Sequence, residues 1–248
     1  MDGGEVENLR KRFNEDHPNE VEIPKGGIEQ TWNAIRKRLH TDCDECIVAS
    51  MLHQSSAPKT WETNPEEWLS SVDIDKVEKE YTRLFKNYKY LGTLPIDFDK
   101  HSETGTCLID SICSMNINDL YAKGKTQIGI VFNTDVNSGP GQHWISIFCD
   151  LRPELEYPRF TYFDSYASKP EKEIQRLMRK WKQQWDSQNK RKLFLSYNKT
   201  RHQYEDSECG MYCLYFHYCC LTGISMKQRI PDEVVRGFRG LLFRVSKK

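Results

Sequence analysis

Cys209 and Gly210 open a long apolar stretch, and the polar residues that a cysteine nucleophile needs stand earlier in the chain as His143, Asp164 and Gln203. A thiol ionises at about pH 8.5 and attacks a carbonyl carbon only as the thiolate. It therefore needs a nearby base and a positive environment. The four residues together predict acyl transfer through a cysteine nucleophile.

Each of these residues has a chemical role in the hypothesis. His143 acts as the general base, and Asp164, at the end of a strand-like run, holds one imidazole nitrogen and fixes its tautomer. Cys209 is expected at the start of a helix, where unpaired backbone N–H groups and the helix dipole stabilise a thiolate. Gln203 offers a side-chain N–H that joins the Cys209 backbone N–H as an oxyanion donor. The predicted catalytic triad is His143, Asp164 and Cys209.

The order of these residues resembles the SUMO-protease (Ulp) superfamily of cysteine peptidases. Within it, the chain is most similar to the polyprotein-processing proteases of large cytoplasmic DNA viruses, such as African swine fever virus. The specific similarity covers about residues 127 to 244. The segments that carry it are Asn133-Thr134-Asp135, Gly139 to Trp144, Arg201 to Gly210, Pro231-Asp232-Glu233, Phe238-Arg239 and Leu242-Phe243-Arg244.

This resemblance implies a papain-like, Ulp-type core and cleavage after Gly-Gly, because these enzymes admit only residues without side chains through a narrow tunnel. It implies that the substrates are viral structural polyproteins with Gly-Gly-Xaa sites, cut during virion maturation in the host cytoplasm and the virion. The position that orients the histidine resembles an Asn in the viral enzymes. In this chain it is Asp164, as in the wider superfamily. Trp144 is expected as a wall against His143, and Asn133 is expected to shape the substrate side.

Other functions stay open at this point. A single His-Trp pair on a strand is most often a packed histidine, and a single Cys-Gly at a helix start is most often core. Their joint occurrence with Asp164 and Gln203 favours catalysis. The alternatives are an isopeptidase that removes SUMO or ubiquitin, and a pseudoprotease that serves as a non-catalytic scaffold or nucleic-acid binder. Nothing in residues 1 to 126 resembles modifier-binding elements, which favours precursor processing.

The composition predicts a soluble intracellular enzyme without a cofactor. Lys and Arg number 36, as do Asp and Glu, and 38% of the residues are hydrophobic. No apolar run approaches the roughly 20 residues that cross a bilayer, and the acidic N-terminus lacks the apolar centre of a signal peptide. We therefore expect a reducing compartment, no membrane partner and no disulfide framework among the nine cysteines.

The apolar pattern predicts an α+β fold with a mixed sheet flanked by helices. Residues 1–24 are polar and are predicted to be a flexible tail, residues 25–90 a small helical arm, and residues 91–248 the protease core. Alternating apolar residues predict strands between 127 and 164, with another at 193–195. Apolar stripes predict a helix over 174–185, a fully buried helix over 211–221 and a final helix that starts near Pro231.

Two groups of cysteines invite other interpretations. A Cys-x-x-Cys pair flanked by histidines could bind zinc if all four residues converge: His40, Cys43, Cys46 and His53. The spacing is not that of a standard finger, which favours reduced cysteines packed in the arm and no metal. Cys213, Cys219 and Cys220 are expected as small apolar residues of the buried helix.

Two further features concern partners and self-processing. Residues 169–201 contain eleven Lys or Arg against three acidic residues, so this neutral chain has a local basic segment. A solvated helix face is favoured there over contact with viral DNA, because aromatic residues do not alternate with the cations. Gly3-Gly4-Glu5 and Gly26-Gly27-Ile28 are candidate self-cleavage sites, after Gly4 and Gly27, if they are exposed.

Overall fold

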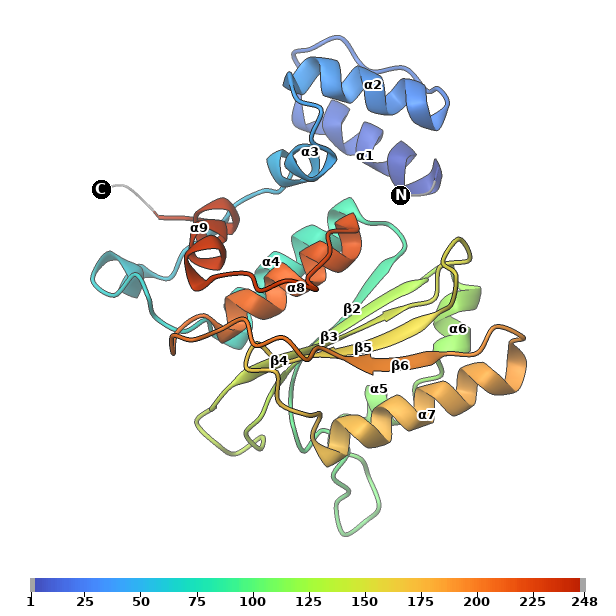
Figure 1. Cartoon of the computed structure of the whole chain (residues 1–248), viewed down its shortest axis with the longest axis vertical. Helices are drawn as coiled ribbons and strands as arrows, with labels where there is room; N and C mark the ends of the chain where they lie inside the picture. Colours follow the sequence, from blue (N-terminus) through green and yellow to red (C-terminus); the bar gives the residue numbers. More distant parts are fainter. Residues whose placement is uncertain (1–2, 246–248) are drawn as a thin grey trace.

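A five-stranded mixed sheet forms the centre of the molecule (Figure 1). A computed structural model describes residues 3–245, with Glu45 described by its backbone alone. The strand order is β2 (Tyr88–Pro95), β3 (Gln127–Asn133), β4 (Trp144–Asp150), β5 (Arg159–Phe163) and β6 (Phe194–Tyr197). The outer pairs are parallel, and β4 is antiparallel to both of its neighbours. The predicted α+β class with a mixed sheet is confirmed.

Helices cover both faces of this sheet (Figure 1). One face carries α4 (Ser71–Leu84) and α8 (Cys209–Thr222), with α9 (Asp232–Leu242) packed against α8. The opposite face carries α5 (Asp110–Cys113), α6 (Ile117–Ala122) and α7 (Lys172–Gln188). Because both faces are covered, β3 and β4 are buried almost throughout, and most of their residues are apolar.

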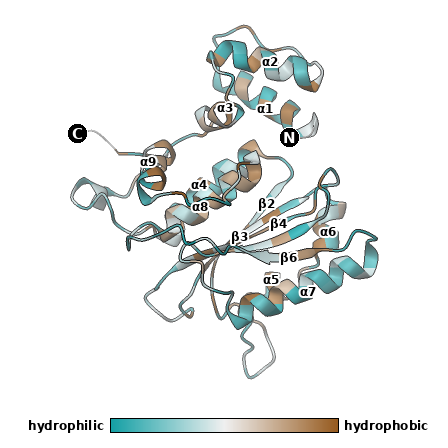
Figure 2. Ribbon diagram, in the orientation of Figure 1, coloured by the Kyte–Doolittle hydropathy of each residue, from teal (hydrophilic) through white to brown (hydrophobic). Residues whose placement is uncertain are grey.

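The two long core helices differ in the way that their sequences predict. In α7 the buried residues recur at steps of three and four and are Ile174, Leu177, Met178, Trp181 and Trp185. Nearly all of α8 is buried, because the sheet, α4 and α9 surround it. Figure 2 shows this contrast, with brown residues along α8 and mostly teal residues on α7. The predicted stripe in α7 and the predicted complete burial of α8 are both confirmed.

A buried polar network ties α4 into the core. Nδ1 of His217 lies 2.6 Å from Glu78 Oε1, and the Tyr88 hydroxyl donates to Glu78 Oε2 at 2.8 Å. Gly129 leaves room for this network, since a Cβ there would lie 2.1 Å from the Tyr88 oxygen. The predicted boundary at residue 90 is therefore wrong: it falls inside β2, and α4 belongs to the core on which α8 packs.

The N-terminal residues form a helix, so the predicted flexible tail over 1–24 is wrong. Helix α1 (Gly3–Asp16) buries Val6, Leu9 and Phe13, which are spaced by three and four residues. The many charged residues between them concealed this stripe in the sequence. Together with α2 (Ile28–Leu39) and α3 (Asp44–Ser50), α1 makes an arm beyond the α4 and α8 layer (Figure 1). Met1 and Asp2 lie outside the described residues.

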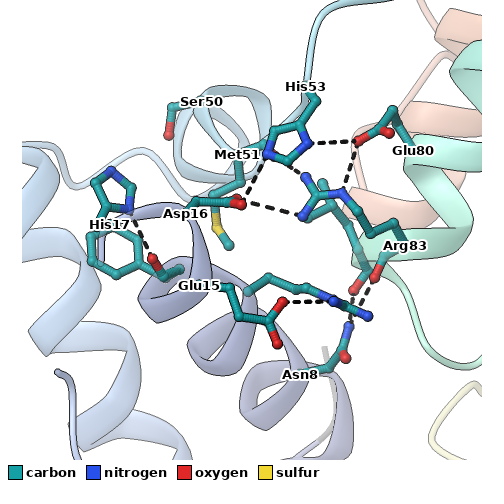
Figure 3. A network of polar contacts seen from close by, with 12 residues as sticks. Asn8, Glu15, Asp16, His17, Ser50, Met51, His53, Glu80 and Arg83 are labelled. Carbon is teal, nitrogen blue, oxygen red and sulfur yellow. Dashed lines mark hydrogen bonds and ion pairs between the residues drawn. The ribbon is translucent and has the colours of Figure 1, made fainter. Parts of the chain in front are cut away.

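Polar contacts join this arm to α4 (Figure 3). Asp16 of α1 lies 2.9 Å from His53 Nε2 and 3.5 Å from Arg83. Arg83 also pairs with Glu80 at 2.8 Å and donates to the Met51 carbonyl at 2.6 Å. The guanidinium of Arg83 is therefore the common partner of groups from α1, from α4 and from the residue that follows α3.

Four cysteines are joined in disulfides, Cys43 with Cys46 and Cys107 with Cys113, so the expectation that all nine are reduced is wrong. Their Cα–Cα separations are 5.1 and 6.4 Å, which a disulfide can span. Short sequence separations in turns produce this proximity. Cys213 and Cys219 are buried in α8 and Cys220 is half-buried there, as predicted.

The histidines that flank Cys43 and Cys46 do not join them in a metal site. His53 contacts Asp16 and Glu80 instead, and His40 caps the end of α2. Within residues 3–245, no group of three or more His, Cys, Asp or Glu is arranged to hold a metal ion. None of the helices described over the same range has the length and apolar character needed to cross a membrane.

The remaining short elements complete the C-terminal edge. Strand β1 (Ser55–Ser56) pairs in parallel with β7 (Phe243–Arg244), which follows α9 directly. A 3-10 turn, η1 (Lys59–Glu62), places Trp61 against Phe243. The segment between α3 and α4 is thus fastened to the end of the chain.

The packing of α1 predicts that Leu9→Ala destabilises the protein, because it removes a fully buried side chain. Such a substitution lowers the free energy of unfolding by about 2–5 kcal/mol, and denaturant unfolding measures it. Val21→Ala serves as a control, since Val21 is 82% exposed. Equal stability of the two variants would mean that α1 does not pack as described.

Candidate active site

Cys209 is the first residue of α8 and is buried at its N-terminal end. The backbone N–H groups of a first helical turn have no partner within the helix, and the helix dipole places partial positive charge there. The sulfur therefore lies at the end of the helix that carries these donors. The predicted placement of Cys209 at a helix start is confirmed.

His143 and Asp164 meet at one edge of the sheet. His143 directly precedes β4 and Asp164 directly follows β5, and these strands are antiparallel neighbours. Nε2 of His143 lies 2.7 Å from Asp164 Oδ1. Cys209 is the second side chain that acts on this imidazole and raises its pKa. Since Asp164 engages Nε2, Nδ1 is the nitrogen left for the thiol.

The charge state of His143 follows from these partners. Burial alone would lower the pKa of His143, but its interactions with Asp164 and Cys209 outweigh burial and raise the pKa to about 9. The imidazole is therefore protonated at neutral pH. An imidazolium between a carboxylate and a sulfur is the arrangement in which a thiolate is stabilised.

The Asp164 carboxylate is held by the turn that follows it. Backbone N–H groups of Tyr166 and Ser168 each donate to it at 3.0 Å. Burial would raise the pKa of Asp164, but His143 and these donors lower it below its ordinary value. Ala167, at the centre of the turn, has a φ of 62°, in the left-handed region that disfavours a side chain.

Two further side chains fix this pair, and the sequence interpretation missed both. Asn198, which follows β6, donates to the Asp164 carbonyl at 2.7 Å and accepts from the Asp164 N–H at 2.9 Å. The Tyr166 ring stacks on His143 with centroids 4.9 Å apart. The only signal for Tyr166 was its position two residues after Asp164.

Gln203 is fully buried, and its amide is oriented by two hydrogen bonds. Its Oε1 accepts from the Ser165 hydroxyl at 2.6 Å, and its Nε2 donates to the Glu205 carbonyl at 2.6 Å. A side-chain amide has two N–H groups, so one remains for an external acceptor. His202, the neighbouring residue, is buried instead as a structural acceptor for the Ile230 N–H.

A pocket of about 520 Å³ begins beside this cluster. Trp68 and Trp144 line it together with Asn133, and the Trp144 indole N–H donates to the Leu69 carbonyl at 2.9 Å. Gly210 permits the approach of these walls to the nucleophile, since a Cβ there would lie 3.1 Å from Leu69 and 3.2 Å from the Trp144 ring. Trp68 was missed from the sequence, where it stands alone.

Asn133 shapes the loop that precedes His143. Its Oδ1 accepts from the N–H groups of Asp135 and Gln142 at 2.9 and 3.0 Å. The Asp135 carboxylate in turn accepts from Gly141 at 3.0 Å. Gly139 must lack a side chain, because a Cβ would lie 2.2 Å from that carboxylate. Asn133 thus lines the pocket and also organises the loop.

A buried ion pair lies directly beside the nucleophile, and no sequence pattern predicted it. Glu208, the residue before Cys209, is fully buried and lies 3.1 Å from Arg239 of α9. Arg239 also donates to the carbonyls of Pro65 and Glu67 at 3.2 and 2.9 Å. Because Trp68 follows Glu67, Arg239 links the start of α8 to one wall of the pocket.

Residues 169–201 use much of their positive charge within the chain. Arg176 pairs with Asp99 at 2.9 Å, and Lys182 pairs with Asp186 at 2.8 Å. Arg191 donates to the carbonyl of Pro153 at 3.0 Å. These contacts within the chain engage part of the positive charge of residues 169–201.

The fold and this cluster define a papain-like cysteine peptidase architecture. A comparison of the sequence with protein families identifies the family. The model of the Ulp1 protease family, C-terminal catalytic domain, matches residues 116–243, and the chain belongs to that family. The match begins at the loop before α6 and ends in β7, so it contains His143, Asp164 and Cys209.

Individual relatives are viral. Thiol protease R355 of Acanthamoeba polyphaga mimivirus is 31% identical over 182 residues, covering 72% of this chain and 57% of that protein. Cysteine protease S273R of African swine fever virus is 34% identical over 136 residues, covering 51% of this chain and 49% of the relative. The chain thus spans about half the length of these curated relatives.

The fold extends beyond the sequence match. The crystal structure of the African swine fever virus pS273R protease aligns with 99% of this chain and 91% of its own, with a TM-score of 0.66 and 19% identity. A likeness at this identity shows the fold. The aligned region includes the N-terminal arm, which lies outside the residues that the family model matches.

The Glu208–Arg239 pair predicts that a single variant loses more stability than the double variant. Arg239→Gln leaves the buried Glu208 carboxylate without its nearest cation, and breaking such a pair costs about 3–5 kcal/mol of stability. Adding Glu208→Gln removes the unpaired charge and is expected to restore part of that loss. Denaturant unfolding compares the two, with Arg176→Gln, which breaks a half-exposed pair with Asp99, as control. A double variant less stable than Arg239→Gln would contradict this account.

Proposed function

We propose that this protein is a cysteine endopeptidase that cleaves viral structural polyprotein precursors after Gly-Gly during virion maturation. The observation that carries the proposal is the imidazole of His143 held between Asp164 and Cys209, with Cys209 at the start of a helix. The viral relatives support proteolysis through a cysteine, since their names describe cysteine and thiol proteases.

The proposed reaction assigns one role to each of these residues. The Cys209 thiolate attacks the scissile carbonyl while the free N–H of Gln203 and the backbone N–H of Cys209 hold the developing oxyanion. Protonated His143 then delivers its proton to the leaving amine, and Asp164 keeps the ring in place. Water, deprotonated by the now neutral His143, releases the acyl-enzyme as a free carboxylate.

The preference for Gly-Gly is supported by the approach to Cys209. Trp68 and Trp144 line the pocket beside the nucleophile, and the Trp144 ring is fixed by its bond to the Leu69 carbonyl. Bulky walls next to the site would disfavour substrates that carry side chains near the scissile bond. A substrate with two glycines there has the smallest cross-section that a peptide offers.

The cellular setting belongs to the same proposal. The substrates are precursors with Gly-Gly-Xaa sites, in the host cytoplasm and in the virion. An isopeptidase that removes SUMO or ubiquitin would use the same triad and is the outcome to be separated by experiment. A pseudoprotease is disfavoured, because Gln203, His143 and Asp164 all keep oriented partners. Contact with DNA through residues 169–201 has little support, since much of their charge is engaged internally.

Peptide turnover tests this function. Wild type is expected to cut a Gly-Gly-Xaa peptide and to fail on the Ala-Ala-Xaa counterpart. Cys209→Ala is expected to be inactive, because it removes the nucleophile, and Gln203→Ala to lose about 100-fold or more in kcat, because it removes an oxyanion donor. Chromatographic assay of the products measures each rate.

Matched controls use the same residue types elsewhere in the chain. Cys220→Ala, on the same helix, and Gln30→Ala, on the exposed arm, should retain wild-type rates. Turnover only of SUMO or ubiquitin fusions would replace precursor processing with the isopeptidase function. Silence on every substrate would contradict the enzyme itself.

A further inference from the structure

We infer that the protein is its own substrate and that one molecule cuts another between Gly27 and Ile28, in the segment that joins α1 to α2. This inference rests on the proposed Gly-Gly specificity. The segment is exposed from Pro24 to Gln30, and it has no regular structure before α2 begins at Ile28. A protease needs such an exposed, extended segment, because the substrate backbone must enter the site as a single strand.

The fold itself does not require glycine at either position. Gly27 has φ −66° and ψ 164°, a conformation open to any residue, and Gly26 is likewise outside the left-handed region. The nearest atom to a Cβ on Gly26 would be the end of the flexible Gln30 side chain at 3.1 Å, and one on Gly27 would lie 4.0 Å from the same atom. Glycine is tolerated as the N-cap, but Ser or Asp would add a capping hydrogen bond.

The second Gly-Gly pair lacks this accessibility. Helix α1 begins at Gly3, so the bond between Gly4 and Glu5 lies within its first turn. Glu5 and Val6, on the leaving side of that bond, are both buried. Cleavage after Gly4 would require α1 to unwind and its buried face to separate. The structure therefore distinguishes two sites that the sequence alone treats as equal.

Access to the Gly27–Ile28 bond needs only a local opening. The Gly27 carbonyl accepts from Thr31 N–H at 2.9 Å, and the Gly27 N–H donates to Gln30 at 3.3 Å. Both bonds belong to the first turn of α2, and helix ends open with little free energy. Residues up to Ile23 stay anchored on α1, where the Ile23 carbonyl accepts from Arg10 and Asn14 at 2.6 and 3.1 Å.

The chemistry is the proposed hydrolysis without any additional reactant. The Cys209 thiolate of one molecule forms a thioester with the Gly27 carbonyl carbon of another, the C–N bond breaks, and His143 protonates the Ile28 nitrogen. Water then cleaves the thioester, giving the Gly27 carboxylate and free Cys209. Figure 1 places the segment in the arm, away from the start of α8, so the cut occurs between two molecules.

After the cut, only non-covalent contacts would hold α1 to the rest of the molecule. These contacts are the apolar side of α1, which includes Leu9 and Phe13, and the ion pairs of Asp16 with His53 and Arg83 (Figure 3). Intermolecular cleavage also makes the rate depend on protein concentration. Processing would therefore produce a distinct form of the enzyme in which the arm is a separable fragment.

The test uses the full-length Cys209→Ala chain as substrate and a catalytic amount of wild type. Intact-mass spectrometry is expected to detect two products, residues 1–27 and 28–248, that accumulate with time. Gly27→Val in the substrate chain should block the cut, because the added side chain cannot pass the aromatic walls. Gly4→Val, an equal change at the exposed start of α1, should leave it unaffected.

A Gly-Gly-Xaa peptide in the same reactions separates the two levels of inference. If the peptide is cut while the Cys209→Ala chain keeps its full mass, self-processing is refuted and the proposed function stands. If neither is cut, both fail. Cleavage that persists in Gly27→Val, or that maps after Gly4, would also overturn the assignment of the Gly27–Ile28 bond.

Discussion

The contact between Asp164 and His143 is the interaction on which the site depends. At 2.7 Å it opposes the effect of burial on the imidazole and contributes to holding the pKa of His143 near 9, so that a positive charge faces Cys209 at neutral pH. The sheet makes this contact possible, because β4 and β5 are antiparallel neighbours that bring the two residues to one edge. The remaining architecture must bring the start of α8 to that edge.

Several buried polar contacts meet this requirement. Glu208 is joined to Arg239 of α9, and Arg239 also holds the backbone that leads to Trp68. On the other side, Ser165 orients Gln203, and Asn198 binds both backbone groups of Asp164. Buried ion pairs and amides seldom add much net stability, but an unpaired one is costly, so they restrict the site to one arrangement. Preorganisation of this kind is what an oxyanion site needs.

Much of the site was predictable because it follows from local sequence patterns. The apolar run after Cys209 predicted the buried helix, and the alternation around Ile145 and Tyr162 predicted the strands that carry His143 and Asp164. Side chains that act through tertiary contacts had no local signal. Arg239 is separated from Glu208 by 31 residues, and Trp68 from Trp144 by more than 70. Their roles appear only when α9 and the segment before α4 fold against α8.

The N-terminal arm shows the limit of composition as a guide. Val6, Leu9 and Phe13 form a regular helical stripe, yet charged neighbours gave the segment the average character of a tail. The cysteine pairs were missed for a similar reason, since proximity in a turn depends on backbone conformation. The spacing of a few apolar residues therefore predicts the helix better than the mean polarity of the segment does.

The most direct test of the central claim is an NMR titration of the His143 imidazole in wild type, Asp164→Asn and Cys209→Ala. The account predicts a pKa of about 9 in wild type, because both partners stabilise the imidazolium. Removing either partner should lower it, since burial then opposes the charge with less compensation. A wild-type pKa at the ordinary histidine value of about 6.5, unchanged in both variants, would contradict it.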